Sequence, residues 1–211
     1  EALIDTGFEM LGLNTRQGEP DLGERGLAAV PGRETDARNI IDEAIEYAFG
    51  IHCKNIHVIA GKTQRTPDAE ETFQKNLTYA AQKASNHGKT ILIEPLNLLD
   101  NPGYHLSTLD EALVTLEAVN HPSLKIMFDC YHLQIMQGNL LQRLQRHLPK
   151  IGHIQFANAP GRTEPDKGEI NFPWLFAEID RIGWNGFLGA EYIPLQKPEE
   201  SLGWLQNFTR S

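Results

Sequence analysis

The sequence predicts an α/β protein built as a (β/α) barrel, and three observations lead to this prediction. Short apolar segments alternate with helical segments six times along the 211 residues, which is typical of a parallel sheet. No Gly-x-Gly-x-x-Gly turn follows a strand, which disfavours an open sheet that binds a dinucleotide. Polar residues stand at the ends of several predicted strands, where barrels carry their functional groups. A complete (β/α)8 barrel has eight units, so we expect about six of them here, without the two N-terminal units.

The N-terminal part of the chain predicts two strands and a helix around a long loop. A glycine closes a short helical tail over residues 1–7, because glycine readily takes the left-handed conformation at a helix end. Residues 8–14 form the first strand. The glycine- and proline-rich residues 15–32 form a loop of a length that is usually functional or mobile. Apolar residues at helical spacing predict a helix over 34–50, and a strand follows over 55–61.

The middle of the chain continues this alternation. Residues 67–87 predict a long polar helix with one apolar face, which ends at a glycine. Residues 90–94 form the third strand. Ser107 opens a helix over 109–119, whose first turn carries two acidic residues where the helix dipole favours negative charge.

The C-terminal part adds three strands and three helices. The strands are expected over 125–128, 151–156 and 186–192. The first helix is expected over 131–147 and the last over 198–208. Between them, Asn171 can cap a helix that has Pro173 in its first turn, where the missing backbone N–H of proline is harmless.

Composition indicates a globular protein and narrows the classes of partner. The formal charge of −9 argues against nucleic acid, because proteins that bind phosphate backbones need clustered Lys and Arg. No apolar run approaches the roughly 20 residues of a membrane helix, and no leader-like segment precedes the first strand. Cys53 and Cys130 lack the spacing of a zinc site or a disulfide scaffold, which favours a cytoplasmic location. No linker-like stretch divides residues 1–211, so we expect a single domain.

Four of the strands are expected to end on a side chain that offers an oxygen ligand. These residues are Glu94, Asp129, Gln155 and Glu191. Carboxylate and amide oxygens suit a hard divalent ion such as Mg²⁺ or Mn²⁺, and carboxylates packed together repel one another unless a cation or protons intervene. For any single residue, a helix cap or a solvated loop carboxylate is an equal alternative. The four together indicate a metal site at the ends of the barrel strands.

Basic residues near these strand ends are candidates for binding a substrate. His132 lies three residues after Asp129, so both can face one cleft, although a surface hydrogen bond at a helix start is the alternative. Arg162 lies in a Gly- and Pro-rich loop and could bind a carboxylate through two hydrogen bonds, unless it pairs with a nearby Glu. Arg25 in the first long loop is a candidate of the same kind.

Three further residues have a structural interpretation. His153 lies two residues before Gln155 and shares its side of the strand, so it could support that residue or fill the barrel core. His57 and Cys130 are interpreted as packing residues. Cys130 has no neighbouring base in the sequence that would activate it as a nucleophile.

Several short motifs occur in order along the chain. They are Gly23-Glu-Arg-Gly26, Ile93-Glu-Pro-Leu-Asn97, Asn101-Pro-Gly-Tyr104, Phe128-Asp-Cys-Tyr-His132, Gly152-His-Ile-Gln155, Pro160-Gly-Arg162, Gly168-Glu-Ile-Asn171 and Gly189-Ala-Glu-Tyr192. Together they resemble the hydroxypyruvate isomerase family, within the xylose isomerase-like TIM barrels, over essentially the whole chain.

The resemblance implies a barrel of which this chain covers about the last three quarters. It also implies an aldose–ketose type isomerase that converts hydroxypyruvate to 2-hydroxy-3-oxopropanoate, or acts on a 2-oxotetronate. Glu94 and Glu191 match the paired acid/base glutamates of the family, and together with Asp129 and Gln155 they match its metal site. Proton transfer would pass through an enediolate. The binding partner that the resemblance implies is the substrate, a small hydroxy-oxo acid.

In this mechanism His132 would hold a substrate oxygen and Arg162 the substrate carboxylate. A sugar 3-epimerase acting on a neutral ketose is one alternative, although such enzymes usually have His where Gln155 stands. A metal-dependent phosphodiesterase or AP endonuclease is a second, and the charge of −9 counts against it. A non-catalytic, degenerate barrel is a third. Assembly of the chain into a homo-oligomer is compatible with each of these hypotheses.

Overall fold

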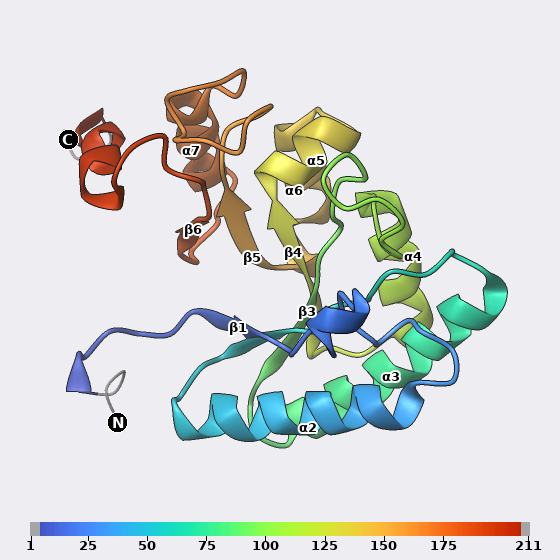
Figure 1. The fold of residues 1–211 in the computed structure, drawn as a ribbon. Coiled ribbons are helices and arrows are strands. Elements are labelled where there is room, and N and C mark those ends of the chain that lie inside the picture. Colours follow the sequence, from blue (N-terminus) through green and yellow to red (C-terminus); the bar gives the residue numbers. More distant parts are fainter. Residues whose placement is uncertain (1–4, 208–211) are drawn as a thin grey trace. The chain divides into compact units, whose positions relative to one another are not determined.

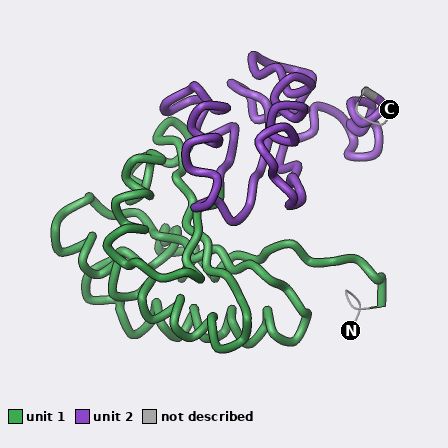
Figure 2. The backbone as a smooth tube through the Cα atoms, turned by 180° about the vertical axis from the view of Figure 1, so that it is seen from behind, with its two compact units in different colours: residues 1–127 green, residues 128–211 purple. Residues whose placement is uncertain are grey.

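A computed structural model describes residues 5–207. The chain divides into two compact units, Glu1–Met127 and Phe128–Ser211, coloured green and purple in Figure 2. The single domain that the sequence predicts stays a prediction. Residues 1–4 of the expected helical tail lie outside the described residues, and Gly7 has the expected left-handed backbone, with φ of 70°.

The first unit is a parallel sheet with helices packed on it. Its strands are β1 (Gly12–Asn14), β2 (Asn55–His57), β3 (Thr90–Ile93) and the first part of β4 (Leu124–Asp129). They pair in parallel in chain order. Its helices are α2 (Glu34–Gly50), α3 (Pro67–Ser85) and α4 (Leu109–Val119), with a short 3-10 turn η1 (Pro20–Leu22) in the long loop. Helices α2 and α3 pack against each other along the sheet (Figure 1).

The second unit begins within β4 and repeats the strand and helix alternation. Its elements are α5 (Cys130–Met136), α6 (Leu140–His147), η2 (Leu148–Lys150), β5 (Ile151–Phe156), α7 (Phe172–Arg181), β6 (Leu188–Ala190) and the 3-10 helix η3 (Pro198–Asn207). Strands β5 and β6 pair in parallel. The alternation expected from the sequence is therefore present in both units.

Strand burial explains the parallel pairing. Ile56 of β2 is fully buried, as are Ile91 and Ile93 on one side of β3 and Leu92 on the other. Strands that are apolar on both faces need helices on each side, which a βαβ connection supplies. No helix among residues 5–207 is long and apolar enough to cross a membrane.

Helix starts follow the expected caps, with one correction. Asn171 caps α7 by accepting a hydrogen bond from the Trp174 N–H at 3.3 Å, and a proline occupies the first turn. Helix α4 is capped by Thr108, whereas the sequence indicated Ser107. Thr108 accepts a hydrogen bond from the Glu111 N–H at 3.2 Å, and the Glu111 carboxylate accepts one from the Thr108 N–H at 3.1 Å. This reciprocal capping box satisfies two donors at once.

Several predicted boundaries are wrong. The helix expected over 131–147 is broken into α5 and α6, because Gly138 and Asn139 both have left-handed backbones, with φ of 62° and 53°, which a continuous helix cannot contain. Strand β2 ends at His57 rather than at residue 61. The Val58 N–H still bonds to the Leu92 carbonyl at 2.9 Å, but the next two N–H groups bond to side chains: Ile59 donates to the Thr15 hydroxyl and Ala60 to that of Tyr104. Strand β6 is likewise shorter than expected, and the last helix is a 3-10 helix.

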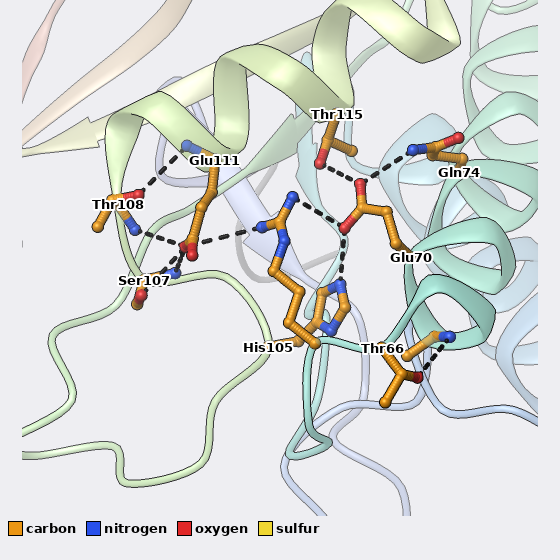
Figure 3. Close-up of polar contacts among 10 residues, drawn as sticks. Thr66, Glu70, Gln74, His105, Ser107, Thr108, Glu111 and Thr115 are labelled. Atoms are coloured by element: carbon orange, nitrogen blue, oxygen red, sulfur yellow. Dashed lines mark hydrogen bonds and ion pairs between the residues drawn. The ribbon is translucent and has the colours of Figure 1, made fainter.

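A buried polar network holds the segment that follows β3 (Figure 3). The Glu70 carboxylate, on the first turn of α3, accepts hydrogen bonds from Thr115 at 2.7 Å, from Gln74 at 3.0 Å and from the His105 ring at 3.2 Å, and it pairs with Arg65 at 2.9 Å. His105 is 2% exposed. The network therefore ties the segment before α4 to the helix before it.

Candidate active site

In the first unit, Glu94 directly follows β3 and is buried. Its Oε2 lies 3.6 Å from Nδ1 of His57, at the end of β2. The same ring nitrogen lies 3.0 Å from Oδ1 of Asn14, at the end of β1, and since an amide oxygen only accepts, Nδ1 carries the proton. Burial lowers the pKa of His57 to about 4. The ring is therefore neutral at neutral pH and contacts a candidate catalytic carboxylate, a contact that its interpretation as a packing residue missed.

In the second unit, Asp129 is the last residue of β4 and the cap of α5. Its Oδ1 accepts a hydrogen bond from the Tyr131 N–H at 2.8 Å, and its Oδ2 lies 3.7 Å from Nε2 of His132. Both side chains are almost fully buried. Burial raises the pKa of Asp129 to about 7, an effect that the Arg162 charge and the Tyr131 N–H oppose and the Glu191 charge reinforces. Asp129 and His132 therefore lie beside each other, and their sharing of one cleft stays a prediction.

Arg162 and Glu191 form an ion pair within this unit. The Arg162 Nη2 lies 2.9 Å from Oε2 of Glu191 and 3.7 Å from Oδ2 of Asp129. Its Nε also donates to the Glu191 backbone carbonyl at 3.3 Å, and the guanidinium lies 5.3 Å above the Tyr131 ring. The Glu191 side chain is 49% exposed, whereas that of Asp129 is 0% exposed. One guanidinium thus connects a buried carboxylate with an exposed one.

Gln155 and His153 lie on β5, on the same side of that strand. Gln155 pairs with Gly189 in the parallel register of β5 and β6, and alternation along each strand puts His153, Gln155, Gly189 and Glu191 on one face. A Cβ added to Gly189 would lie 2.9 Å from Nε2 of His153 and 3.3 Å from Cγ of Gln155. Glycine is therefore required there to let both side chains lie against β6.

The donor set fits a divalent cation. Oδ2 of Asp129 and Oε1 of Gln155 are buried and accept no hydrogen bond from any residue in the 5–207 range. Buried oxygens of this kind are costly unless a cation or donor satisfies them. Asp129 and His132 of the second unit are buried residues that could each supply one ligand atom. His132, which the sequence assigns to the substrate, is thus also a candidate ligand.

Two residues from the sequence analysis stand apart from this chemistry. Arg25 is exposed in the first unit and donates to the Gln17 side chain at 2.9 Å, so its role in binding a substrate stays a prediction. Cys130 is fully buried, and burial raises the pKa of its thiol. Its thiolate is therefore disfavoured, in keeping with a packing role.

Known proteins similar to this chain cover nearly all of it. A 2-oxo-tetronate isomerase of Cupriavidus necator is 44% identical over 198 residues, which span 92% of this chain and 76% of the relative. A hydroxypyruvate isomerase of Escherichia coli is 39% identical over 198 residues, which span 92% of this chain and 77% of that protein.

Solved structures and a family model agree with these relatives. A crystal structure described as an AP endonuclease of family 2 from Brucella melitensis matches with a TM-score of 0.94 and 38% identity, over 98% of this chain and 81% of the other. A 3-keto-D-glucoside 4-epimerase of Escherichia coli, at 21% identity and a TM-score of 0.81, shares the fold. The model of the xylose isomerase-like TIM barrel family matches residues 1–208. The α/β barrel class predicted from the sequence is confirmed, and the chain belongs to the xylose isomerase-like TIM barrel family.

Proposed function

We propose that this chain is an isomerase of small 2-oxo hydroxy acids, acting on hydroxypyruvate or on a 2-oxotetronate. The names of two relatives support this, a 2-oxo-tetronate isomerase at 44% identity and a hydroxypyruvate isomerase at 39% identity. The structural observation that carries the proposal is the Arg162 guanidinium, 2.9 Å from the Glu191 carboxylate. A cation fixed beside a candidate base is what recognition of a substrate carboxylate requires.

The reaction requires one carbon-bound proton to move. For hydroxypyruvate, a base removes a proton from C3, which gives an enediolate, and an acid returns a proton to C2. The C3 hydroxyl proton is lost as that carbon becomes an aldehyde, and the former C2 carbonyl oxygen gains a proton. The product is 2-hydroxy-3-oxopropanoate, and no oxidant or reductant is consumed. One carboxylate that removes the proton and one that returns it are sufficient for both transfers.

Glu191 and Glu94 are the proposed pair that transfers the proton. The Glu191 carboxylate is half-exposed and held by Arg162, so it can exchange its partner for the substrate. Glu94 is buried beside the neutral ring of His57, which suits a carboxylate that must keep one orientation. Arg162 would bind the substrate carboxylate and His132 a substrate oxygen.

A divalent cation, Mg²⁺ or Mn²⁺, is the proposed cofactor, with Glu94, Asp129, Gln155 and Glu191 as ligands. The buried, unsatisfied oxygens of Asp129 and Gln155 support this assignment, and His132 is a further candidate ligand. When bound, such a cation polarises a carbonyl oxygen and so acidifies the neighbouring C–H bond. Asp129, fixed by the Tyr131 N–H, would orient this site without transferring a proton itself.

Proton NMR in D₂O tests the proposal directly. Hydroxypyruvate and the 2-oxotetronates are incubated with the protein, with and without EDTA. The expected result is isomer formation, carbon-bound deuterium in the product and loss of turnover with EDTA. Turnover without deuterium incorporation would instead support a hydride shift, and absence of turnover with every acid would refute the substrate class.

Two other activities are separated from this one by charge. A sugar 3-epimerase has a neutral substrate, so Arg162→Ala should leave its KM unchanged, whereas the proposed isomerase should show a KM raised about tenfold or more. Arg181→Ala is the matched control, since Arg181 pairs with Glu178 on the exposed side of α7. A nuclease of the same fold would need a basic surface for phosphates, and the formal charge of −9 disfavours it.

A cytoplasmic location is part of the proposal. Both cysteines, Cys53 and Cys130, are free and buried, as expected in a reducing compartment. The proposed binding partner is the substrate, a small hydroxy-oxo acid. The two relatives carry the names of such acids, 2-oxo-tetronate and hydroxypyruvate.

A further inference from the structure

The loop that carries Arg162 has little regular structure of its own, yet it is closed at its base by one side chain. Asn158 lies two residues after the end of β5, where the loop begins, and its exposed fraction is 1%. Its amide nitrogen donates to the carbonyls of Pro165 at 2.6 Å and Ile170 at 3.1 Å. Its amide oxygen accepts from the N–H groups of Ala159 and Ile170, both at 2.9 Å. All four hydrogen-bonding positions of the amide are therefore used.

These bonds join the two ends of the loop. Asn158 stands at the start of the loop and Ile170 at its end. The Asn158 side chain therefore makes the hydrogen bonds that hold the two ends of the loop together. The two ends of the loop approach each other closely at Gly168. A Cβ added to Gly168 would lie 2.5 Å from Oδ1 of Asn158 and 2.4 Å from the Ala159 carbonyl oxygen. Only glycine leaves room for this closure.

Backbone hydrogen bonds within the closed loop hold Arg162 and the residue after it. The Asn158 N–H donates to the Thr163 carbonyl at 3.0 Å, which turns the chain back directly after Arg162. Arg162 has a left-handed backbone, with φ of 53°, and a non-glycine residue keeps such a backbone only where its surroundings fix it. Its carbonyl accepts from the Ile193 N–H at 2.7 Å. The loop is thus held at Arg162, which reaches Glu191, and at Thr163 directly after it.

We propose that Asn158 is a positioning residue that sets the substrate-binding geometry of Arg162. The inference rests on the proposed function, since it assigns to Arg162 the substrate carboxylate. Removing the amide would leave the carbonyls of Pro165 and Ile170 without donors and let the loop open. Arg162 would then lose its fixed place, and binding of the acid would weaken while the proton-transferring carboxylates stay intact.

A double-mutant cycle with hydroxypyruvate tests this. Asn158→Ala is expected to raise KM about tenfold with kcat changed less than about threefold, since Arg162 binds the ground state and the transition state alike. In the Arg162→Ala background, Asn158→Ala should raise KM less than about twofold further, because its effect passes through Arg162. If the alanine variant does not fold, Asn158→Ser replaces it in the same double-mutant cycle. Asn76→Ala is the matched control: Asn76 is also fully buried and donates to the Ala28 carbonyl, so it should cost stability without changing KM.

Limited trypsin digestion gives a second readout that needs no substrate. Trypsin cleaves after Arg162 and Lys167, and both bonds should become at least about tenfold more sensitive in Asn158→Ala than in the wild type or in Asn76→Ala. Equal KM effects in both Arg162 backgrounds, or unchanged cleavage, would overturn the inference. If Arg162→Ala alone leaves KM unchanged, the role of Arg162 in the proposed function fails, and the cleavage rates still decide whether Asn158 holds the loop.

Discussion

Glu70 makes the folded protein sensitive to acid, and the size of the effect follows from its contacts (Figure 3). Burial raises the pKa of this carboxyl, but hydrogen bonds from His105, Thr115 and Gln74 and the charge of Arg65 outweigh it, so the pKa falls from 4.5 to about 2. The side chain is only 17% exposed. Each pKa unit is worth about 1.4 kcal/mol, so ionised Glu70 stabilises the fold by about 3 kcal/mol.

The sign follows from linkage. Because the folded pKa lies below the unfolded value, the stabilisation is fully present above pH 4.5 and is lost as the pH falls from there to about 2. Glu70→Gln should therefore be about 3 kcal/mol less stable than the wild type at pH 7, and the difference should shrink towards zero near pH 2. Other carboxyl groups titrate in both proteins and cancel in this difference.

Urea unfolding followed by circular dichroism, at several values of pH between 2 and 7, measures this difference. Glu71→Gln is the matched control, because Glu71 is the next residue on the same helix and pairs with Lys75 on its exposed side. Such pairs contribute less than about 1 kcal/mol, so the control should follow the wild type throughout. A difference between Glu70→Gln and the wild type that stays constant from pH 5 to pH 2 would refute the argument.

Three further predictions concern the second unit. Glu191→Gln should lower kcat by about 10³-fold or more with an unchanged circular dichroism spectrum, and a variant with near wild-type turnover would contradict its role as the base. Asp129→Asn should weaken Mn²⁺ binding by at least about tenfold in isothermal titration calorimetry, because it removes a charged ligand; unchanged affinity would remove Asp129 from the metal site. Gly189→Ala should cost about 1–3 kcal/mol in urea unfolding, because its methyl group meets the buried His153 ring. Gly203→Ala, where a methyl group meets nothing within 4 Å, should cost little, and an equal cost for both variants would show that the contact with His153 is not the cause.

The parts of the fold that local chemistry determines could be predicted from the sequence. The strands around Ile56 and Ile91 are apolar on both faces and buried, which is enough to indicate a parallel sheet. The start of α7 at Asn171 follows from a cap and a proline in the first turn. The break between α5 and α6 was missed, although Gly138 and Asn139 are residues that tolerate a left-handed backbone. Apolar residues continue on both sides of that turn, so their spacing alone predicts one continuous helix.

The candidate site was only partly accessible to the same reasoning. Strand ends located Asp129 and Glu191, because the alternation of strands and helices fixes where such residues emerge. The contact of His57 with Glu94 was not predicted, since it joins residues on neighbouring strands whose register the sequence does not state. Asn158 was missed for a related reason: an asparagine in a loop looks like any turn residue, and only the fold brings Ile170 to its side chain.

The contrast between Asp129 and Glu191 suggests how two carboxylates bound to one arginine can serve different purposes. Asp129 is fully buried, fixed by the Tyr131 N–H at 2.8 Å, and lies 3.7 Å from the guanidinium. Glu191 is half-exposed and bonds to the guanidinium at 2.9 Å. A proton-transferring group must change its partner during the reaction, which costs least for a side chain that water can reach. A ligand must instead keep its geometry, which burial enforces. The proton transfer is therefore better assigned to Glu191, and Asp129 to the cation that compensates its buried charge.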